Sequence, residues 1–329
     1  MDLRAFLPAL ATYAGIADQD LLEKDVRLHF LLQALAQDPA VGEDLVFKGG
    51  TCLIKCYLAY PRFSIDLDFT WRRQDDWAER GTKRVREATR PARREALRAV
   101  DRHGRALGME RPASGGVTYA RSGQMMTAAL HYRSATRVPE FVKVQINFVE
   151  PILFEVRSRN AASLLAGRRP EELDFLEPDL TAMYAAPVAC ASYDPREILA
   201  EKCRAILTRQ ATKARDLLDL YLIEKDLGFR VEAHLDAVRR KVQFSAERTE
   251  RYRRHVAAPG ERFKALLEED VRPLLLREID LDGFEAYRRR ILGVLEAQGR
   301  ALREANQGGG PTGEKSEPRA RSPPGEGVR

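Results

Sequence analysis

Residues that commonly build metal and redox sites are scarce in this chain. Its 329 residues include only four cysteines and five histidines. The cysteines form no Cys-x-x-Cys pair and have no companion histidine at the spacing of a zinc site. They stand at Cys52, Cys56, Cys190 and Cys203. The pattern argues against a structural zinc site, and we expect reduced, mostly buried thiols in a cytosolic protein.

Long hydrophobic runs are also missing. No uninterrupted apolar stretch approaches the roughly 20 residues that a membrane-spanning helix needs. The first residues, Met1-Asp-Leu-Arg, lack the profile of a secretory signal. We therefore expect a cytoplasmic protein with no membrane partner.

The composition that is present fits a globular protein. Charged residues make up 32% and hydrophobic residues 44%, and the formal net charge is +6. A chain of this length can bury one large core or two moderate ones, and its length favours two lobes. The modest basic excess, carried largely by arginine, suits a phosphate-rich partner without requiring one.

The most informative stretch begins with a glycine turn. The apolar run at residues 45–47 predicts a short strand that leads through Lys48 into Gly49 and Gly50. Two residues without Cβ allow a sharp turn and a close approach of backbone amides to an anion. Thr51 follows at the start of a predicted helix, where its hydroxyl and free N–H groups suit phosphate oxygens.

Two carboxylates follow on a second predicted strand. Residues 65–69 alternate apolar and acidic side chains, which places Asp66 and Asp68 on the same side of the strand. Carboxylates held so close repel each other unless a cation lies between them, and a hard divalent ion such as Mg²⁺ is the cation that such a pair is suited to bind. A phosphate cradle beside a paired-carboxylate metal site is what phosphoryl or nucleotidyl transfer requires.

This combination resembles a known superfamily. Gly-Gly-Thr at residues 49–51, with Arg-x-Ser-x-Asp-x-Asp-Phe at residues 62–69, resembles the signature of the DNA polymerase β-like nucleotidyltransferases. The form Lys-Gly-Gly-Thr resembles more narrowly the AbiEii/AbiGii-type toxins of type IV toxin–antitoxin and abortive-infection systems. The resemblance implies that Lys48 belongs to the phosphate cradle. It also implies that Arg62 and Ser64 fix the turn before the metal strand, with Ser64 close to a phosphate.

The sequence departs from this pattern at the third carboxylate. Related enzymes carry one on a strand adjacent to the Asp-x-Asp strand, and the corresponding strand here, Phe141–Glu150, has Gln145 at that position. An amide is a weaker ligand for a hard cation and a poor general base. Either Asp66 and Asp68 hold one metal together with the nucleotide's phosphates, or the register differs. Glu150 is the nearest alternative acid, off the end of the strand.

A second block of the same toxin family is similar to residues 201–219. Glu201-Lys202 is followed by Arg215-Asp216-x-x-Asp219, and the resemblance implies that Lys202 reaches the phosphates and that Asp216 belongs to the cleft. A lysine stabilises the charge that builds on the transferring phosphate. Asp216 either orients Lys202 or acts in place of the missing acid. Arg215 and Asp216 are equally read as a surface ion pair, and Asp219 as a structural cap.

Periodicity predicts the remaining elements. We expect helices at 17–37, within 72–105, and at 195–209, 213–223, 232–243, 245–257, 260–270 and 284–304, and strands at 116–121, 125–132 and 141–150. His29 is expected to be a partly exposed helix residue. Residues 157–195 are interpreted as mixed loops and short helices because four prolines punctuate them.

The expected fold is therefore α/β (α+β). A polymerase β-like nucleotidyltransferase lobe with a mixed sheet spans residues 1–155, and a mainly helical lobe at 156–305 completes the cleft. A disordered tail is expected at 306–329 because glycine, proline, serine and charges dominate it. The stretch 72–105 holds twelve Arg or Lys against six Asp or Glu, which is read either as a solvated helical face or as a surface for RNA phosphates.

The predicted function follows from these parts. Asp66, Asp68, Lys202 and Asp216 are the candidate catalytic residues of an Mg²⁺-dependent enzyme that moves NMP from an NTP to an acceptor. The resemblance implies that the acceptor is the tRNA 3′ end, that the modification blocks translation, and that an antitoxin is encoded alongside without a stable complex being required. Two alternatives stay open: transfer to a small molecule or protein side chain, and a nucleotide- or RNA-binding module weakened by Gln145.

Overall fold

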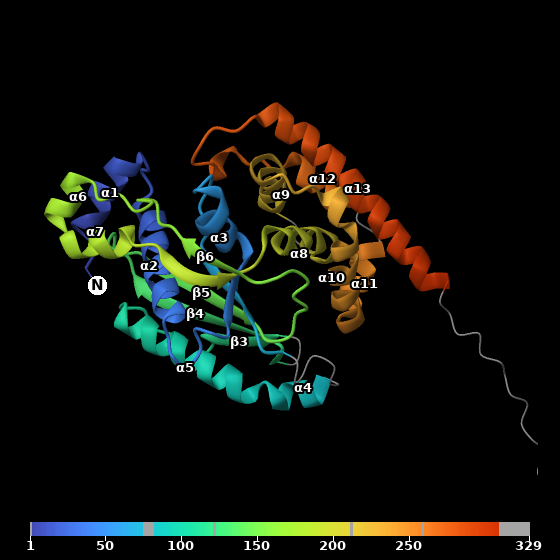
Figure 1. The fold of residues 1–329 in the computed structure, drawn as a ribbon, viewed down its shortest axis with the longest axis horizontal. Helices are drawn as coiled ribbons and strands as arrows, with labels where there is room; N and C mark the ends of the chain where they lie inside the picture. Colours follow the sequence, from blue (N-terminus) through green and yellow to red (C-terminus); the bar gives the residue numbers. More distant parts are fainter. Residues whose placement is uncertain (1, 75–81, 121–122, 211–212, 258–259, 309–329) are drawn as a thin grey trace, which may run out of the picture.

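A single mixed sheet forms the centre of the protein. The structure, a computed structural model, describes residues 2–74, 82–120, 123–210, 213–257 and 260–308. Its strands are β1 (Leu45–Lys48), β2 (Asp66–Trp71), β3 (Val117–Ala120), β4 (Met125–Arg133), β5 (Pro139–Asn147), β6 (Arg157–Ala161) and β7 (Val188–Ser192). They lie in the order β3-β4-β5-β2-β1-β7-β6 (Figure 1). The pairs β2/β5 and β1/β7 are parallel and the other neighbours are antiparallel. The expectation of a mixed sheet in an α/β fold is confirmed.

Helices surround this sheet and form a second region beside it. Before β7 these are α1 (Phe6–Ala14), α2 (Gln19–Ala36), α3 (Gly49–Leu53), the π-helix η1 (Ile54–Leu58), α4 (Thr82–Ala88), α5 (Arg90–Ala106), α6 (Glu171–Leu176) and α7 (Pro178–Ala185). After β7 they are α8 (Pro195–Thr208), α9 (Ala214–Leu227), η3 (Val231–His234), α10 (Leu235–Arg248), α11 (Glu250–Ala257), α12 (Gly260–Glu268), η4 (Arg272–Leu274) and α13 (Leu281–Gly308).

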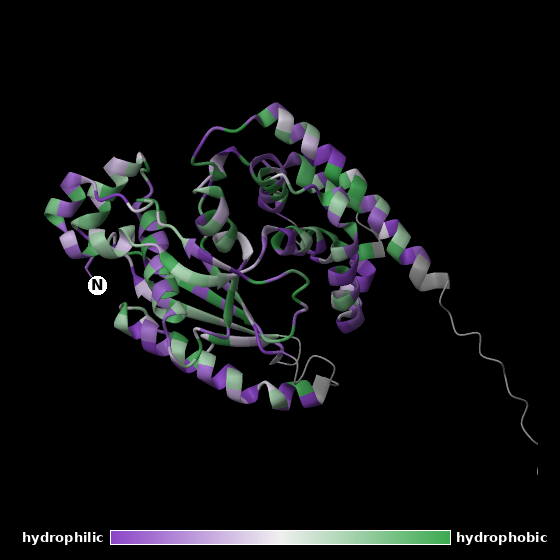
Figure 2. Ribbon diagram, viewed as in Figure 1, coloured by the Kyte–Doolittle hydropathy of each residue, from purple (hydrophilic) through white to green (hydrophobic). Residues whose placement is uncertain are grey.

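The two faces of the sheet have different characters. Leu67, Phe69, Val144 and Ile146 are buried on the face that α5 covers, and a Cβ on Gly104 of α5 would touch Leu130 of β4. Polar residues alternate with these along the same strands and point to the other face. In Figure 2 hydrophobic and hydrophilic residues alternate along α5, whose hydrophobic side lies against the sheet. The polar face of the sheet is therefore the one available for chemistry.

A smaller hydrophobic cluster joins α1, α6 and α7 to α2. Phe6, Leu22, Phe30 and Tyr184 are among its buried members. Because this cluster covers the side of α2 away from the sheet, His29 is completely buried and its Nε2 lies 3.0 Å from the Ala186 carbonyl oxygen. The expectation that His29 is partly exposed is wrong, since the sequence of α2 does not reveal the helices that pack on its second face.

Most predicted elements lie where the periodicity indicates. The helix expected at 17–37 is α2, which Asp18 caps by accepting a hydrogen bond from the Leu21 N–H at 2.9 Å. Asp194 likewise caps α8, the helix expected at 195–209, by accepting a hydrogen bond from the Arg196 N–H at 3.0 Å. The strands β6 and β7 were not predicted. β7 pairs with β1 and β6 pairs with β7, so these two strands form one end of the sheet. The division of the chain after residue 155 stays a prediction.

Parts of two predicted segments lie outside the described residues. These are residues 75–81 of the arginine-rich stretch and residues 309–329 of the predicted tail. Helix α13 continues to Gly308, somewhat beyond the predicted end at 304. Across the described residues, no helix has the length and apolar character needed to cross a membrane.

Candidate active site

One cavity of about 350 Å³ lies between the polar face of the sheet and the helices that follow β7. All of the predicted site residues except Thr51 line it. The lining consists of Lys48, Gly49, Gly50, Arg62, Ser64, Asp66, Asp68, Met125, Gln145, Asn147, Ile198, Glu201, Lys202, Arg204, Ala205, Arg209, Arg215, Asp216 and Tyr252. Two blocks more than a hundred residues apart in sequence therefore meet at one site.

The glycine turn needs glycine for two separate reasons. Gly49 has φ +76°, which L side chains rarely adopt, and a Cβ there would lie 2.6 Å from Oδ2 of Asp68. At Gly50 a Cβ would lie 2.8 Å from Nη2 of Arg62. The turn is packed so tightly against Asp68 and Arg62 that any side chain would displace the groups that line the cavity.

Thr51 lies in the first turn of α3, as predicted, but it does not line the cavity. Its side chain is buried beneath the cavity, where its hydroxyl is 2.7 Å from the Ser64 hydroxyl and donates to the carbonyl oxygen of Asp66. This bond joins the start of α3 to the start of β2. Ser64 itself does line the cavity.

The strand register sets the metal-site candidates in a row. Across the sheet Lys48 of β1 pairs with Asp68 of β2, and Asp68 pairs with Gln145 of β5. Paired residues point to the same face, so Gln145 stands directly beside Asp68. The register assumed from the sequence is confirmed, and the neighbour of Asp68 on β5 is an amide.

Asp68 is the least compensated carboxylate of the site. Among the described residues, no group makes a hydrogen bond or an ion pair with it. Burial raises its pKa to about 6, against the attraction of Lys48 and with a further contribution from the charge of Asp66. Asp66 has the Nζ of Lys143 at 3.7 Å. A carboxylate in this setting is stabilised by any cation that reaches the cavity.

Lys202 is held between two carboxylates. Its Nζ lies 2.6 Å from Oδ1 of Asp216 and 2.7 Å from Oδ2 of Asp219. Asp219 also accepts two hydrogen bonds from Arg62. Burial by itself would raise the pKa of Asp219, but the positive charges of Arg62 and Lys202 lower it. Asp219 is thus a central connection rather than a helix cap, and it ties the turn before β2 to helix α9.

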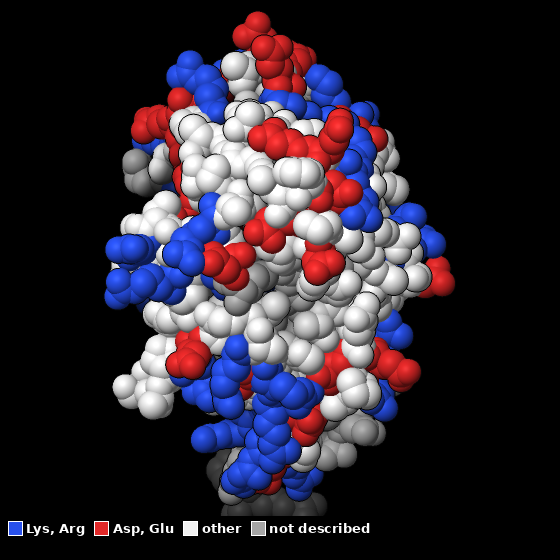
Figure 3. All heavy atoms as spheres, turned by 90° about the vertical axis from the view of Figure 1, so that its left-hand side faces the viewer, with Lys and Arg blue, Asp and Glu red and all other residues white. Residues whose placement is uncertain are grey.

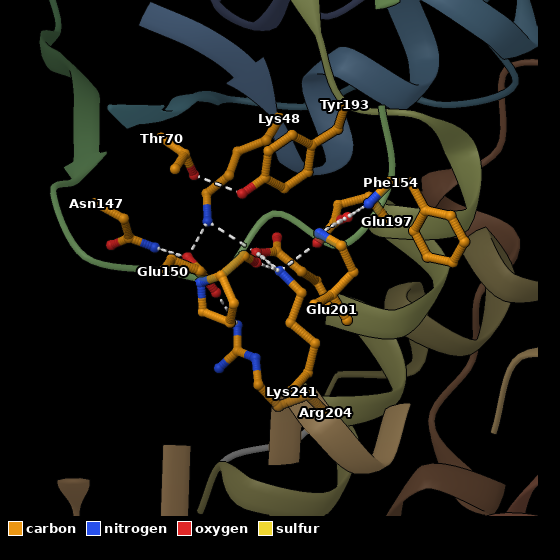
Figure 4. Close-up of polar contacts among 12 residues, drawn as sticks. Lys48, Thr70, Asn147, Glu150, Phe154, Tyr193, Glu197, Glu201, Arg204 and Lys241 are labelled. Carbon is orange, nitrogen blue, oxygen red and sulfur yellow. Dashed lines mark hydrogen bonds and ion pairs between the residues drawn. The ribbon is translucent and has the colours of Figure 1, made fainter. Parts of the chain in front are cut away.

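Behind the cavity lies a buried network of charges (Figure 4). The Nζ of Lys48 is 2.6 Å from Oε2 of Glu150 and 3.1 Å from Oε1 of Glu201. Glu150 also accepts a hydrogen bond from the side-chain amide of Asn147, and its Oε1 lies 3.5 Å from Nη2 of Arg204. Burial alone would lower the pKa of Lys48, but Glu150 and Glu201 raise it. Glu150, the alternative acid considered from the sequence, is therefore bound within this network and does not line the cavity.

Lys241 of α10 extends the network into the helical region. Its Nζ lies 2.5 Å from Oε1 of Glu197, 3.5 Å from Oε1 of Glu201 and 2.7 Å from the Pro151 carbonyl oxygen. Glu197 in turn accepts hydrogen bonds from the backbone N–H groups of residues 153 and 154. The segment after β5, helix α8 and helix α10 are therefore fixed relative to Lys48.

Several residues at the site were not predicted. Glu201 and Arg215 stand inside the second sequence block, and their position beside Lys202 and Asp216 was the available signal. Arg204, Asn147 and Tyr252 gave no comparable signal, because no local pattern distinguishes them from ordinary helix or strand residues. The structure brings them to the cavity through long-range packing.

Comparison with known families identifies the family to which the chain is similar. The model of the nucleotidyl transferase AbiEii toxin family, of type IV TA systems, matches residues 31–306. The match includes both blocks that line the cavity. No curated protein matches the sequence.

Proposed function

The chain belongs to the AbiEii family of nucleotidyl transferase toxins of type IV toxin–antitoxin systems, and from this premise we propose that it transfers NMP from an NTP to the 3′ end of a tRNA. The acceptor hydroxyl oxygen forms a bond to the α-phosphorus, the bond from that phosphorus to the β-phosphate bridging oxygen breaks, and pyrophosphate leaves. The observation that carries the proposal is the meeting of Asp66, Asp68, the glycine turn and Lys202 at one cavity.

Asp66 and Asp68 are the proposed ligands of Mg²⁺. The support is the chemistry of the pair: two carboxylates on one face of β2, of which Asp68 has no hydrogen-bond or ion-pair partner among the described residues. Among the described residues, no group of three or more His, Cys, Asp or Glu side chains is arranged to hold a metal. Phosphate oxygens of the nucleotide complete the coordination, and the ion supplies charge stabilisation for the transferring phosphoryl group.

Lys202 acts on the phosphates of the donor. An ammonium group has three N–H donors, and Asp216 and Asp219 accept two of them. The third is free to bind a phosphate oxygen on which negative charge builds. Asp216 orients Lys202 in this scheme, and the backbone of Gly49 and Gly50 forms the phosphate cradle.

The choice of RNA as acceptor follows from charge and family. Extension of a tRNA 3′ end blocks aminoacylation and so blocks translation, which is a route to toxicity. A cognate antitoxin encoded alongside restrains the enzyme, with or without a stable complex. A nucleotide- or RNA-binding module with weakened catalysis is the second candidate, and Gln145 beside Asp68 is the observation in its favour.

The test is incubation of the purified protein with total tRNA, Mg²⁺ and each α-³²P-labelled NTP separately. We expect label on tRNA with one or two nucleotides, and none with the Asp66→Ala or Lys202→Ala variants. Label on a small molecule or protein instead would overturn the RNA acceptor. Folded protein that binds NTP and labels nothing would favour the binding module.

A further inference from the structure

Helix α5 carries a line of exposed arginines. We define the arginine stripe as Arg90, Arg94, Arg98, Arg102 and Arg105, which are all exposed. At 3.6 residues per turn they fall within an arc of about 120° and span about 22 Å along the helix. Figure 3 shows Lys and Arg side chains gathered over this part of the molecule, at the bottom of the view.

Part of this charge is uncompensated. Arg98 pairs with Glu95, and Arg102 pairs with the buried Asp38. Among the described residues Arg90, Arg94 and Arg105 have no ion-pair partner. The remaining acid on this side of α5, Asp101, is bound by Arg111 at 2.7 Å. The uncompensated positive charge of the stripe therefore lies toward its two ends, with Arg90 and Arg94 at one end and Arg105 at the other.

The stripe is held on a rigid support. On its inner side α5 buries Ala96, Ala99 and Val100 against the sheet. Near its first turn the guanidinium of Arg93 packs against Gly123, where a Cβ would lie 2.1 Å from Nη1 of Arg93. Gly123 lies two residues before Met125, which lines the cavity. The first turn of α5 is thus connected through residues 123–125 to one wall of the cavity, whereas the stripe lies on the outer side of the helix.

The surface chemistry favours a phosphate backbone over a protein. Helices α4 and α5 contribute none of the large exposed hydrophobic residues of the described chain, whereas the centre of a protein interface is usually rich in apolar and aromatic side chains. A row of arginines is the arrangement that binds successive phosphates, with affinity that is independent of sequence and sensitive to salt.

We propose that the arginine stripe on α5 binds the phosphate backbone of an RNA whose 3′ end enters the cavity. The inference rests on the proposed RNA acceptor and adds the surface that holds it. It also explains why the helix that covers the hydrophobic face of the sheet carries so many arginines on its outer side.

The experiment measures RNA binding directly. A 5′-fluorescein RNA is titrated with wild-type protein and with the triple variant Arg90→Ala/Arg94→Ala/Arg105→Ala, by fluorescence anisotropy over a series of KCl concentrations. The matched control is Arg239→Ala/Arg289→Ala/Arg300→Ala, which removes three exposed arginines from α10 and α13.

For the stripe variant we expect a Kd at least about tenfold higher near 0.1 M salt, and a log Kd–log salt slope smaller by about 2–3, since each phosphate contact contributes roughly 0.7–0.9. The control is expected to retain nearly the wild-type slope. Far-UV circular dichroism and NTP binding, unchanged in both variants, show that the fold and the cavity are intact.

Equal affinity and slope in the stripe variant and wild type would overturn the inference, as would equal losses in the stripe and control variants. A stripe that serves an acidic protein gives the first of these results. Stripe-dependent RNA binding without any label transfer to RNA would leave the surface standing and remove the proposed function. Label transfer to RNA that does not depend on the stripe would do the reverse.

Discussion

Asp219 of α9 and Arg62, which precedes β2, form a two-point ion pair inside the protein. Nε of Arg62 donates to Oδ1 of Asp219 at 2.8 Å, and Nη2 of Arg62 donates to Oδ2 of Asp219 at 2.7 Å. Their side chains are only 0% and 2% exposed, respectively. Because the same carboxylate also binds Lys202, one residue of the helical region fixes both the turn before β2 and the lysine opposite it.

We predict that Asp219→Asn lowers both stability and activity. The amide keeps the shape but leaves Arg62 and Lys202 with too little negative charge, and breaking a buried pair costs about 3–5 kcal/mol. Urea unfolding and label transfer are the measurements. Asp226→Asn on the same helix is the control, because its pair with Arg277 is partly exposed and is worth no more than about 1 kcal/mol. Equal effects of the two substitutions would contradict the central position of Asp219.

Gly49→Ala tests the packing of the turn against Asp68. We predict an activity loss of about 100-fold, since displacing a reactive group by an ångström can cost that much. Gly228→Ala is a matched control: Gly228 has the same φ of +76°, but a Cβ there meets nothing within 4 Å. Both variants carry about 1–2 kcal/mol of left-handed strain, which urea unfolding measures. Retained activity in Gly49→Ala would show that Asp68 moves without consequence.

Lys241→Met tests the buried network. The substitution leaves Glu197 and Glu201 without their shared cation, so we expect a loss of about 3–5 kcal/mol in the free energy of unfolding. The double variant Glu197→Gln/Lys241→Met is expected to recover part of this loss, because it also removes the negative charge of Glu197, which the single substitution leaves buried and without its cation. Lys225→Met, at an exposed lysine, is the control for loss of a charge. No recovery in the double variant would mean that Lys241 acts through packing alone.

The local parts of the site could be predicted from the sequence because they are written in contiguous residues. A glycine pair before a helix and an alternating Asp-x-Asp strand each impose a geometry that few other sequences satisfy. The neighbour of Asp68 on β5 was also predictable, since a half-buried strand fixes which residues share a face, and the structure confirms Gln145 there.

The long-range contacts were not predictable in the same way. Asp219 reads locally as a cap, and only its contact with Arg62, 157 residues away, reveals its position at the site. The partners Lys48 and Glu150 are 102 residues apart. Strand β6 was missed because three of its five residues are exposed, so its sequence, Arg-Ser-Arg-Asn-Ala, lacks the apolar alternation of a half-buried strand. Helix packing on both sides of α2 likewise explains the buried His29.

Burial of His29 predicts a loss of stability in mild acid. Burial, and then the charge of Lys55, lower its pKa from 6.5 to about 4, against smaller opposing effects of Ala186 and Asp25. The folded state resists protonation that the unfolded state accepts, so this stability is complete above pH 6.5 and is lost as the pH falls toward 4. The full loss is about 3 kcal/mol.

The measurement for His29 is the urea midpoint at pH 7 and pH 4.5. We expect His29→Leu to lose less stability between these two values than wild type, because it has no imidazole to protonate. His131→Gln is the control, since His131 is exposed on β4, and it should keep the wild-type difference. An unchanged difference in His29→Leu would assign the acid sensitivity to other groups.

Gln145→Glu tests the proposed cation site from the opposite direction, by adding a group. The substitution sets a third carboxylate beside Asp68 in the register shown by the sheet, and carboxylates bind hard divalent cations far better than amides do. We expect tighter binding of Mn²⁺, used as a spectroscopic probe for Mg²⁺, with the midpoint of a titration followed by electron paramagnetic resonance shifted at least about tenfold. Gln145→Met is the matched control, because it keeps the length of the side chain and removes its oxygen. If the Gln145→Glu and Gln145→Met variants bind Mn²⁺ equally, Asp66 and Asp68 do not form a cation site, and the proposed role of this carboxylate pair is wrong.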